Sequence, residues 1–94
     1  LEMPPAGFST LVGMFMTQAM VGLGVIPNPV SGKAVPQLKL ARHFIDLLGI
    51  IEEKTTGNLD AGEKAMLNST LHQLRTMFLQ QSKTATQQET RDDS

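Results

Sequence analysis

The sequence predicts a small all-α protein, and three observations carry this prediction. Apolar residues recur at helical spacing in three stretches, close to residues 9–23, 36–54 and 61–80. Prolines interrupt the chain between the first two stretches, and a helix-capping pattern precedes the third. With 94 residues the chain forms one domain at most. We therefore expect a three-helix domain over residues 8–80.

The first helix, expected over residues 9–23, is the most informative element. No charged side chain occurs from Met3 to Gly32. Met14 and Val21 lie on the side of this helix opposite its main apolar face. A helix that is apolar on two sides needs two partner surfaces. The main apolar face contains Phe8, Leu11, Val12, Phe15, Met16, Ala19, Met20 and Leu23.

The flanks of this helix carry recognisable signals. Residues 1–7 include two consecutive prolines, which predict an extended lead-in. Ser9 or Thr10 is the expected N-cap, because a hydroxyl can accept a hydrogen bond from a free backbone N–H group. Gly22 or Gly24 is expected to end the helix.

The second helix is expected over residues 36–54, after a proline-rich connector at 24–35 that cannot remain helical. Pro36 is acceptable at the first helical position. Ile50 lies outside the core stripe and is a further candidate contact point. The core stripe of this helix contains Leu40, Ala41, Phe44, Ile45, Leu47, Leu48 and Ile51.

The third helix, expected over residues 61–80, begins with a capping box in which Asp60 is the cap and Glu63 the third helical residue. A short connection forces it to run antiparallel to the second helix, so the two form a hairpin. Residues 81–94 are almost entirely polar, and we expect a flexible tail there. The seam of the third helix contains Leu67, Leu71, Leu74 and Phe78.

Composition excludes several classes of protein. The net charge is −1, and there is no Trp or Tyr, which is a poor basis for binding nucleic acid. There is no Cys, so neither disulfides nor thiolate-bound zinc can stabilise so small a core. Self-association is the remaining ordinary means of stabilisation, and we expect the fold to be completed by oligomerisation.

The cellular location of the protein is predicted from its apolar first helix and from the start of the sequence. Residues 8–26 have the length of a short membrane-spanning helix, but polar residues dilute this stretch and no Lys or Arg flanks it. A buried helix of a soluble protein is therefore favoured, with contact in the membrane plane left open. The chain begins with Leu1, which suggests a processed product, and no basic leader segment precedes the apolar stretch. We expect a cytoplasmic protein.

Several short strings, taken in order, resemble a known family. They are FSTLV at 8–12, IPNP at 26–29 with Ser-Gly at 31–32, IDLL at 45–48, EKTxGNL at 53–59 and LRxxF at 74–78. Over about residues 4–79 the chain resembles the bacterial domain-of-unknown-function family numbered 1844. Asp60 stands where we expect Ser or Thr, and Phe78 stands where Tyr is common. The resemblance implies a small soluble helical protein and no established activity.

The sequence offers no convincing catalytic or metal site, and we expect no cofactor. His43 and His72 are the only histidines, and a transition-metal site needs three or four converging ligands. Glu52 and Glu53 are adjacent, so they point in different directions on a helix and cannot flank one substrate bond. Arg75 is expected to pair with Glu52 across the hairpin, with anion binding as the alternative.

The function predicted from the sequence is therefore that of an interaction module that is not an enzyme. Its partner is a second copy, as a homodimer or higher oligomer, or another protein. One alternative is an accessory subunit whose first helix docks on a larger complex. Another is an enzyme or ligand binder with a site beneath residues 26–35, containing Asn28 or Arg75. The expected interface contains Phe8, Leu11, Met14, Phe15, Gln18, Val21 and Ile50.

Overall fold

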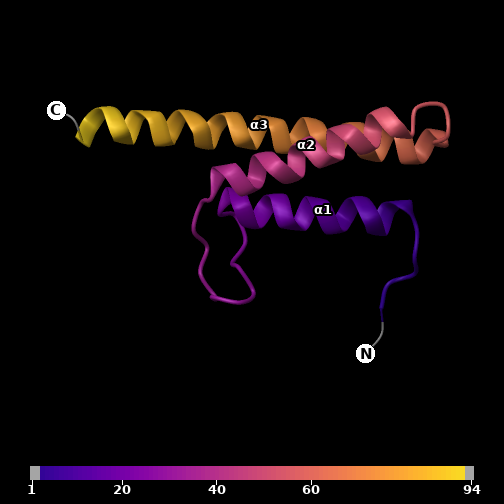
Figure 1. Cartoon of the computed structure of the whole chain (residues 1–94), viewed down its shortest axis with the longest axis horizontal. Coiled ribbons are helices and arrows are strands. Elements are labelled where there is room, and N and C mark those ends of the chain that lie inside the picture. The colour runs from indigo at the N-terminus through magenta and orange to yellow at the C-terminus, as the bar shows by residue number, and fades with distance from the viewer. Residues whose placement is uncertain (1–2, 93–94) are drawn as a thin grey trace.

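Three helices make up the fold in the computed structural model, which describes the backbone of residues 3–92 and the side chains of residues 3–84. They are α1 (Phe8–Leu23), α2 (Leu38–Lys54) and α3 (Ala61–Asp92) (Figure 1). No strand occurs among the described residues. The predicted all-α class is confirmed. Residues 1–2 of the predicted lead-in and 93–94 of the predicted tail lie outside the described part.

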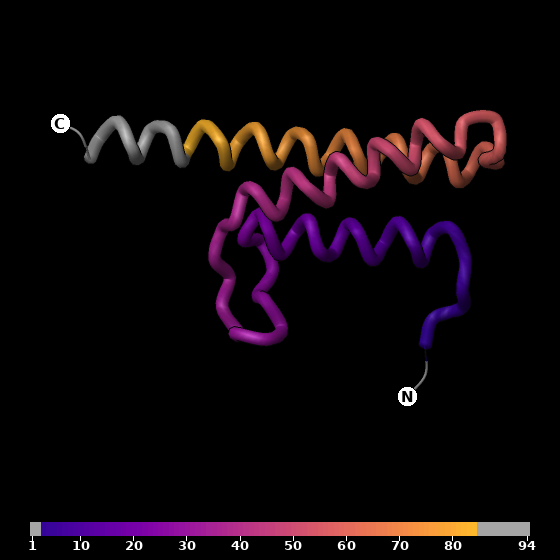
Figure 2. Tube along the Cα trace, viewed as in Figure 1, coloured from indigo at the N-terminus to yellow at the C-terminus, as the bar shows by residue number. Residues whose placement is uncertain are grey.

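The helices run alternately up, down and up. The trace in Figure 2 shows α2 running opposite to α1, and α3 running opposite to α2. Each helix contacts the other two, and α1 packs most extensively on α2. The bundle is flat, with extents of 52 × 34 × 16 Å. Along its longest dimension, α3 continues well past the other two helices (Figure 1). Such a thin assembly leaves much of each helix's circumference without a partner from within the chain.

The core draws three buried side chains from each helix. Their spacing follows the helical period, so each helix buries one stripe. Phe15, Phe44 and Phe78 pack against this core while remaining partly exposed. The buried apolar residues of the cluster are Val12, Ala19, Leu23, Ala41, Ile45, Leu48, Leu67, Leu71 and Leu74.

The N-terminus of α1 differs from the predicted one. The helix begins at Phe8, and its cap residue is Gly7, which makes no side-chain cap. The N–H of Leu11 donates to the Gly7 carbonyl over 3.1 Å, so Ser9 and Thr10 already lie inside the first turn. The Thr10 hydroxyl instead donates to the Pro5 carbonyl over 2.7 Å. The predicted N-cap at Ser9 or Thr10 is wrong, because the helix begins earlier and Gly7 is the cap residue.

A backbone hydrogen bond joins the end of α1 to the start of α2. Gly24 has a φ of 78°, a left-handed conformation that glycine adopts without strain, and it terminates α1. The N–H of Gln37 donates to the Gly22 carbonyl over 2.7 Å. This bond holds Gln37 outside helical geometry, so α2 begins at Leu38 and not at Pro36 as predicted.

Gly22 marks the closest approach of α1 and α2. A Cβ built at Gly22 would lie 2.6 Å from the backbone nitrogen of Ala41 and 2.9 Å from its Cα. Both residues are fully or nearly fully buried. The two backbones therefore cross at a distance that only a glycine on α1 permits.

The turn between α2 and α3 sets the start of α3. Gly57 adopts a φ of 86°, which allows the chain to reverse after α2. The N–H of Glu63 donates to Asp60 Oδ1 over 2.7 Å, and the N–H of Asp60 donates to Glu63 Oε1 over 3.0 Å. These reciprocal bonds form a capping box and satisfy two N–H groups that the helix leaves free.

Replacing Asp60 with alanine is expected to lower the free energy of unfolding by about 1 kcal/mol, because the side-chain cap of α3 is lost. Urea denaturation followed by circular dichroism measures this change. Asp60→Ser is the matched control, since a serine hydroxyl can still accept the bond from Glu63. Equal losses in both variants would contradict the role assigned to the cap.

The end of α3 also differs from the predicted boundary at residue 80. The helix continues to Asp92. Between residues 81 and 92 there is no Gly or Pro, so the sequence contains no residue that would terminate a helix. Flexibility of this polar segment stays a prediction, because a helical geometry does not by itself report motion.

Candidate interaction surface

An exposed apolar stripe follows the side of α1 that is not buried in the bundle. We define the α1 stripe as Leu11, Met14, Phe15 and Gln18, which follow one another at i, i+3, i+4 and i+7. Leu11 is 43% exposed and Met14 is 64% exposed. With Thr17 and with Phe44 of α2, the stripe lines a groove of about 450 Å³. Large apolar side chains thus remain in water on one side of α1.

Aromatic rings form one side of this groove. The rings of Phe15 and Phe44 lie 6.0 Å apart at an interplanar angle of 40°. The ring of His43 meets Phe44 edge-on, with centroids 5.4 Å apart. Contacts of this kind add to the energy of area burial and restrict the rotation of each ring. His43 therefore contacts Phe44 but is not itself a lining residue of the groove.

The groove carries no charge on its described lining residues. The Thr17 hydroxyl donates to the Gly13 carbonyl over 2.9 Å, so it is already used within α1. The Gln18 amide is exposed and makes no hydrogen bond within the described part of the chain. An amide both donates and accepts hydrogen bonds. Gln18 is thus the polar group of this surface that remains available to a partner.

The remaining residues of the predicted interface lie in different settings. Phe8 packs against the core and is half-buried. Val21 is only 8% exposed, so its place in the interface was wrongly predicted. Its burial leaves almost none of its side chain available to a partner. Ile50 is 50% exposed on α2 and does not line the groove.

The predicted pair between Arg75 and Glu52 is not formed. The ion pair found among the described side chains joins Arg42 to Asp46 over 3.8 Å. The guanidinium of Arg75 instead lies over Gly49, with Nη2 3.5 Å from the position that a Cβ would take. Because the helices are antiparallel, residues farther along α3 face earlier residues of α2. Arg75 is therefore about one turn out of register with Glu52.

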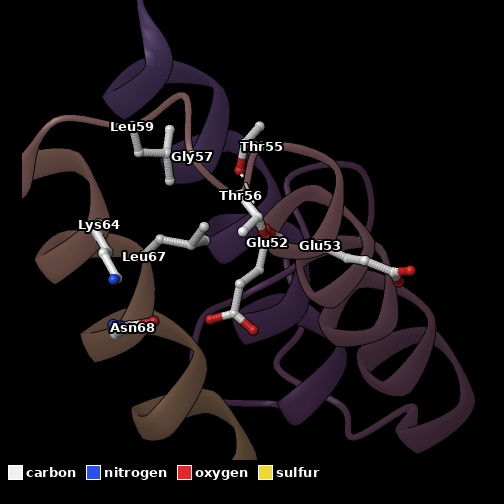
Figure 3. A pocket seen from close by; sticks show the side chains of 9 residues that line it. All are labelled: Glu52, Glu53, Thr55, Thr56, Gly57, Leu59, Lys64, Leu67 and Asn68. Atoms are coloured by element: carbon white, nitrogen blue, oxygen red, sulfur yellow. Dashed lines mark hydrogen bonds between the residues drawn. The ribbon is translucent and has the colours of Figure 1, made fainter.

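A groove of about 390 Å³, lined by polar side chains together with Leu59 and Leu67, lies at the turn between α2 and α3 (Figure 3). The Thr55 and Thr56 hydroxyls donate to the carbonyls of Ile51 and Glu52 over 2.6 and 3.1 Å, so they close the helix. Figure 3 shows the carboxylates of Glu52 and Glu53 pointing apart. The EKTxGNL string thus builds a helix stop here, and no pair of acids converges.

The other candidate sites are not assembled. No group of three His, Cys, Asp or Glu side chains that could hold a metal occurs among the described residues. Asn28 Oδ1 accepts the N–H of Val30 over 2.8 Å, which shapes the connector itself. The connector lies on the side of the bundle away from α3, so Asn28 and Arg75 do not meet (Figure 1).

Two features of the surface were missed from the sequence. Phe44 was assigned to the core stripe of the second helix, yet its ring also lines the groove. Leu79, at 60% exposure, was not singled out at all. Its signal was available, because Leu79 follows Phe78 of the predicted seam and must therefore point away from it.

Comparison with known proteins identifies the family. No curated protein and no solved structure matches the chain. Within the described part of the chain, no helix combines the length and apolar character required to cross a membrane. A family model described as Domain of unknown function (DUF1844) matches residues 5–80. Since this match covers most of the chain, the protein belongs to the DUF1844 family.

Proposed function

We propose that the protein is a non-catalytic interaction module that forms a homodimer through the α1 stripe. The observation that carries the proposal is the exposure of Leu11 and Met14 beside Phe15, on a helix without a single charged residue. Water-exposed apolar surface of this extent is a marker of interaction sites in soluble proteins.

A second copy of the chain suits the surface better than a charged partner does. A two-fold axis brings the same patch of two subunits together, so an uncharged surface meets an uncharged surface. Gln18 is self-complementary in such an arrangement, because one amide can donate to its symmetry mate and accept from it. A partner with charged groups at the contact would leave them unpaired against Leu11 and Met14.

The strength of such an association depends on the apolar surface that it buries. At about 25 cal/mol per Å², burying roughly 600 Å² of apolar surface gives a gross contribution of about 15 kcal/mol. Association and the ordering of side chains consume much of this contribution. The part that remains is consistent with dimers that form at micromolar concentrations.

The absence of catalysis is part of the same proposal. It is supported by the diverging side chains of Glu52 and Glu53 and by the use of the Thr55 and Thr56 hydroxyls within the helix end. Catalysis by a carboxylate pair requires both groups to face one substrate bond. The arrangement at this turn does not provide that geometry.

Light scattering coupled to size exclusion tests the assembly. A protein at micromolar concentration is expected to show twice the chain mass of 10.2 kDa, with dissociation to the single-chain mass on dilution. A constant single-chain mass up to millimolar concentration would overturn the homodimer. Copurification with a stoichiometric foreign protein bound at α1, in place of the second copy, would also overturn it.

A further inference from the structure

A second groove lies between α2 and α3 and shares no lining residue with the α1 stripe. It has a volume of about 380 Å³. Its apolar part combines the buried Ile45, the half-buried Phe78 and the exposed Leu79. Arg42, Asp46 and Arg75 are its charged lining residues. The groove is therefore amphipathic, with apolar side chains between cationic ones.

Arg75 lines this groove and has no counterion among the described residues. Its guanidinium passes over α2 at Gly49, where the missing side chain leaves room 3.5 Å from the ideal Cβ position. No ion pair of Arg75 occurs among the described residues. Arg42 is paired with Asp46 only at 3.8 Å, and both side chains are mostly exposed. An exposed pair at that distance contributes little, so Arg42 can exchange its partner readily.

The positive charge extends beyond the groove. Lys39 precedes Arg42 by three residues, and Lys83 follows Leu79 by four, so each lies on the same side of its helix as its neighbour in the groove. Asp46 is the one carboxylate among the described lining residues. The other described carboxylates of this hairpin, Glu52, Glu53, Asp60 and Glu63, lie toward the turn at its far end. Positively charged side chains therefore predominate in and beside the groove.

We propose that this groove is a docking site for an acidic amphipathic helix of a partner protein. A groove between two packed helices accepts the apolar face of a third helix, with large side chains resting on Ile45, Phe78 and Leu79. Carboxylates flanking that face then meet Arg42 and Arg75, whose planar groups bind a carboxylate through two parallel hydrogen bonds. The lining combines apolar side chains with two arginines, which suits an acidic amphipathic helix, and the lack of Trp and Tyr disfavours nucleic acid.

A set of synthetic helical peptides tests the proposal against the full chain. One peptide carries a leucine stripe flanked by glutamates, a second replaces the glutamates with lysines, and a third keeps the acidic composition but scrambles the stripe. Fluorescence anisotropy measures binding. The acidic amphipathic peptide is expected to bind at least about tenfold more tightly than either control peptide. Amide shifts in nuclear magnetic resonance spectra are expected around Arg42, Ile45 and Leu79.

Substitutions in the chain test which of its residues bind the acidic peptide. Arg75→Gln and Leu79→Ser are each expected to weaken binding of the acidic peptide about tenfold, because one removes a charged donor and the other an apolar contact. Lys64→Gln is the matched control, since it removes one positive charge outside the groove and is expected to leave binding unchanged. All three positions are exposed, so the fold and its thermal midpoint are expected to be retained.

Several outcomes would overturn the proposal. These are no binding by any peptide, equal weakening by Lys64→Gln, shifts confined to the α1 stripe, or binding to anionic phospholipid vesicles in place of the peptides. Because Arg75 and Leu79 lie outside the α1 stripe, both variants are expected to keep the wild-type mass in light scattering. Failure of this docking site and failure of the homodimer are therefore distinguishable.

Discussion

Replacing Gly22 with alanine is expected to lower the free energy of unfolding by about 2–3 kcal/mol. The added Cβ would lie 2.6 Å from the Ala41 nitrogen, and that neighbour is backbone, so it cannot rotate aside. Relief requires α1 and α2 to move apart. That movement lengthens the bond from the Gln37 N–H to the Gly22 carbonyl and opens the core beside Leu23. Adding one methyl group at Gly22 therefore requires the whole helix to shift.

Gly13 provides a matched control within the same helix. A Cβ at Gly13 meets nothing within 4 Å. Gly13→Ala is therefore expected to raise the free energy of unfolding by up to about 1 kcal/mol, because alanine is the better helix former. Urea denaturation at one fixed protein concentration compares the two variants with the wild type. Equal effects of the same sign would show that helix propensity, and not the crossing, controls stability at Gly22.

Much of the fold could be predicted because helical burial imposes a period on the sequence. Leu67, Leu71 and Leu74 were assigned to one seam by spacing alone, and the structure buries all three. The hairpin follows from a connection too short for parallel helices. Positions set by neighbours outside the helix were not predictable. Thr10 has a hydroxyl suited to an N-cap, but α1 already begins at Phe8, so Thr10 lies inside the helix and its hydroxyl donates to the Pro5 carbonyl.

The candidate surface could be predicted only in part, for a related reason. Periodicity shows which residues share a face of α1, and Leu11, Met14 and Gln18 were among the residues predicted for the interface. It does not show how far a neighbouring helix covers that face. Val21 shares a side with Met14, yet it is only 8% exposed, whereas Met14 is 64% exposed. A glycine within a helical pattern does not reveal which backbone it faces.

The same limit explains the misplaced partner of Arg75. The antiparallel hairpin was predicted correctly, but the register between two helices depends on the length and shape of the turn. A difference of one helical turn changes which side chain of α2 an α3 residue meets. Gly49, which has no side chain to suggest a contact, turned out to be the residue beneath the Arg75 guanidinium. The groove bordered by Arg42 and Arg75 follows from that register.

Replacing Met14 with glutamate is expected to convert the proposed dimer into a folded monomer. Met14 is 64% exposed in the single chain, so the substitution removes little core packing. In a two-fold assembly through the α1 stripe, both carboxylates would lose water and find no positive group, since the described groove lining carries no charge. The dissociation constant is expected to rise at least about 100-fold.

Light scattering over a dilution series measures this shift, and circular dichroism checks that the helices persist. Val30→Glu is the matched control, because Val30 is 95% exposed in the connector, outside the groove, and gains the same charge. Ile50→Glu asks whether the interface extends from α1 onto the exposed residue of α2. If Met14→Glu kept the wild-type mass at every concentration while remaining folded, the α1 stripe would not be the interface. If Val30→Glu dissociated the assembly equally, the added negative charge would explain the dissociation, and loss of the contact at Met14 would not be its cause.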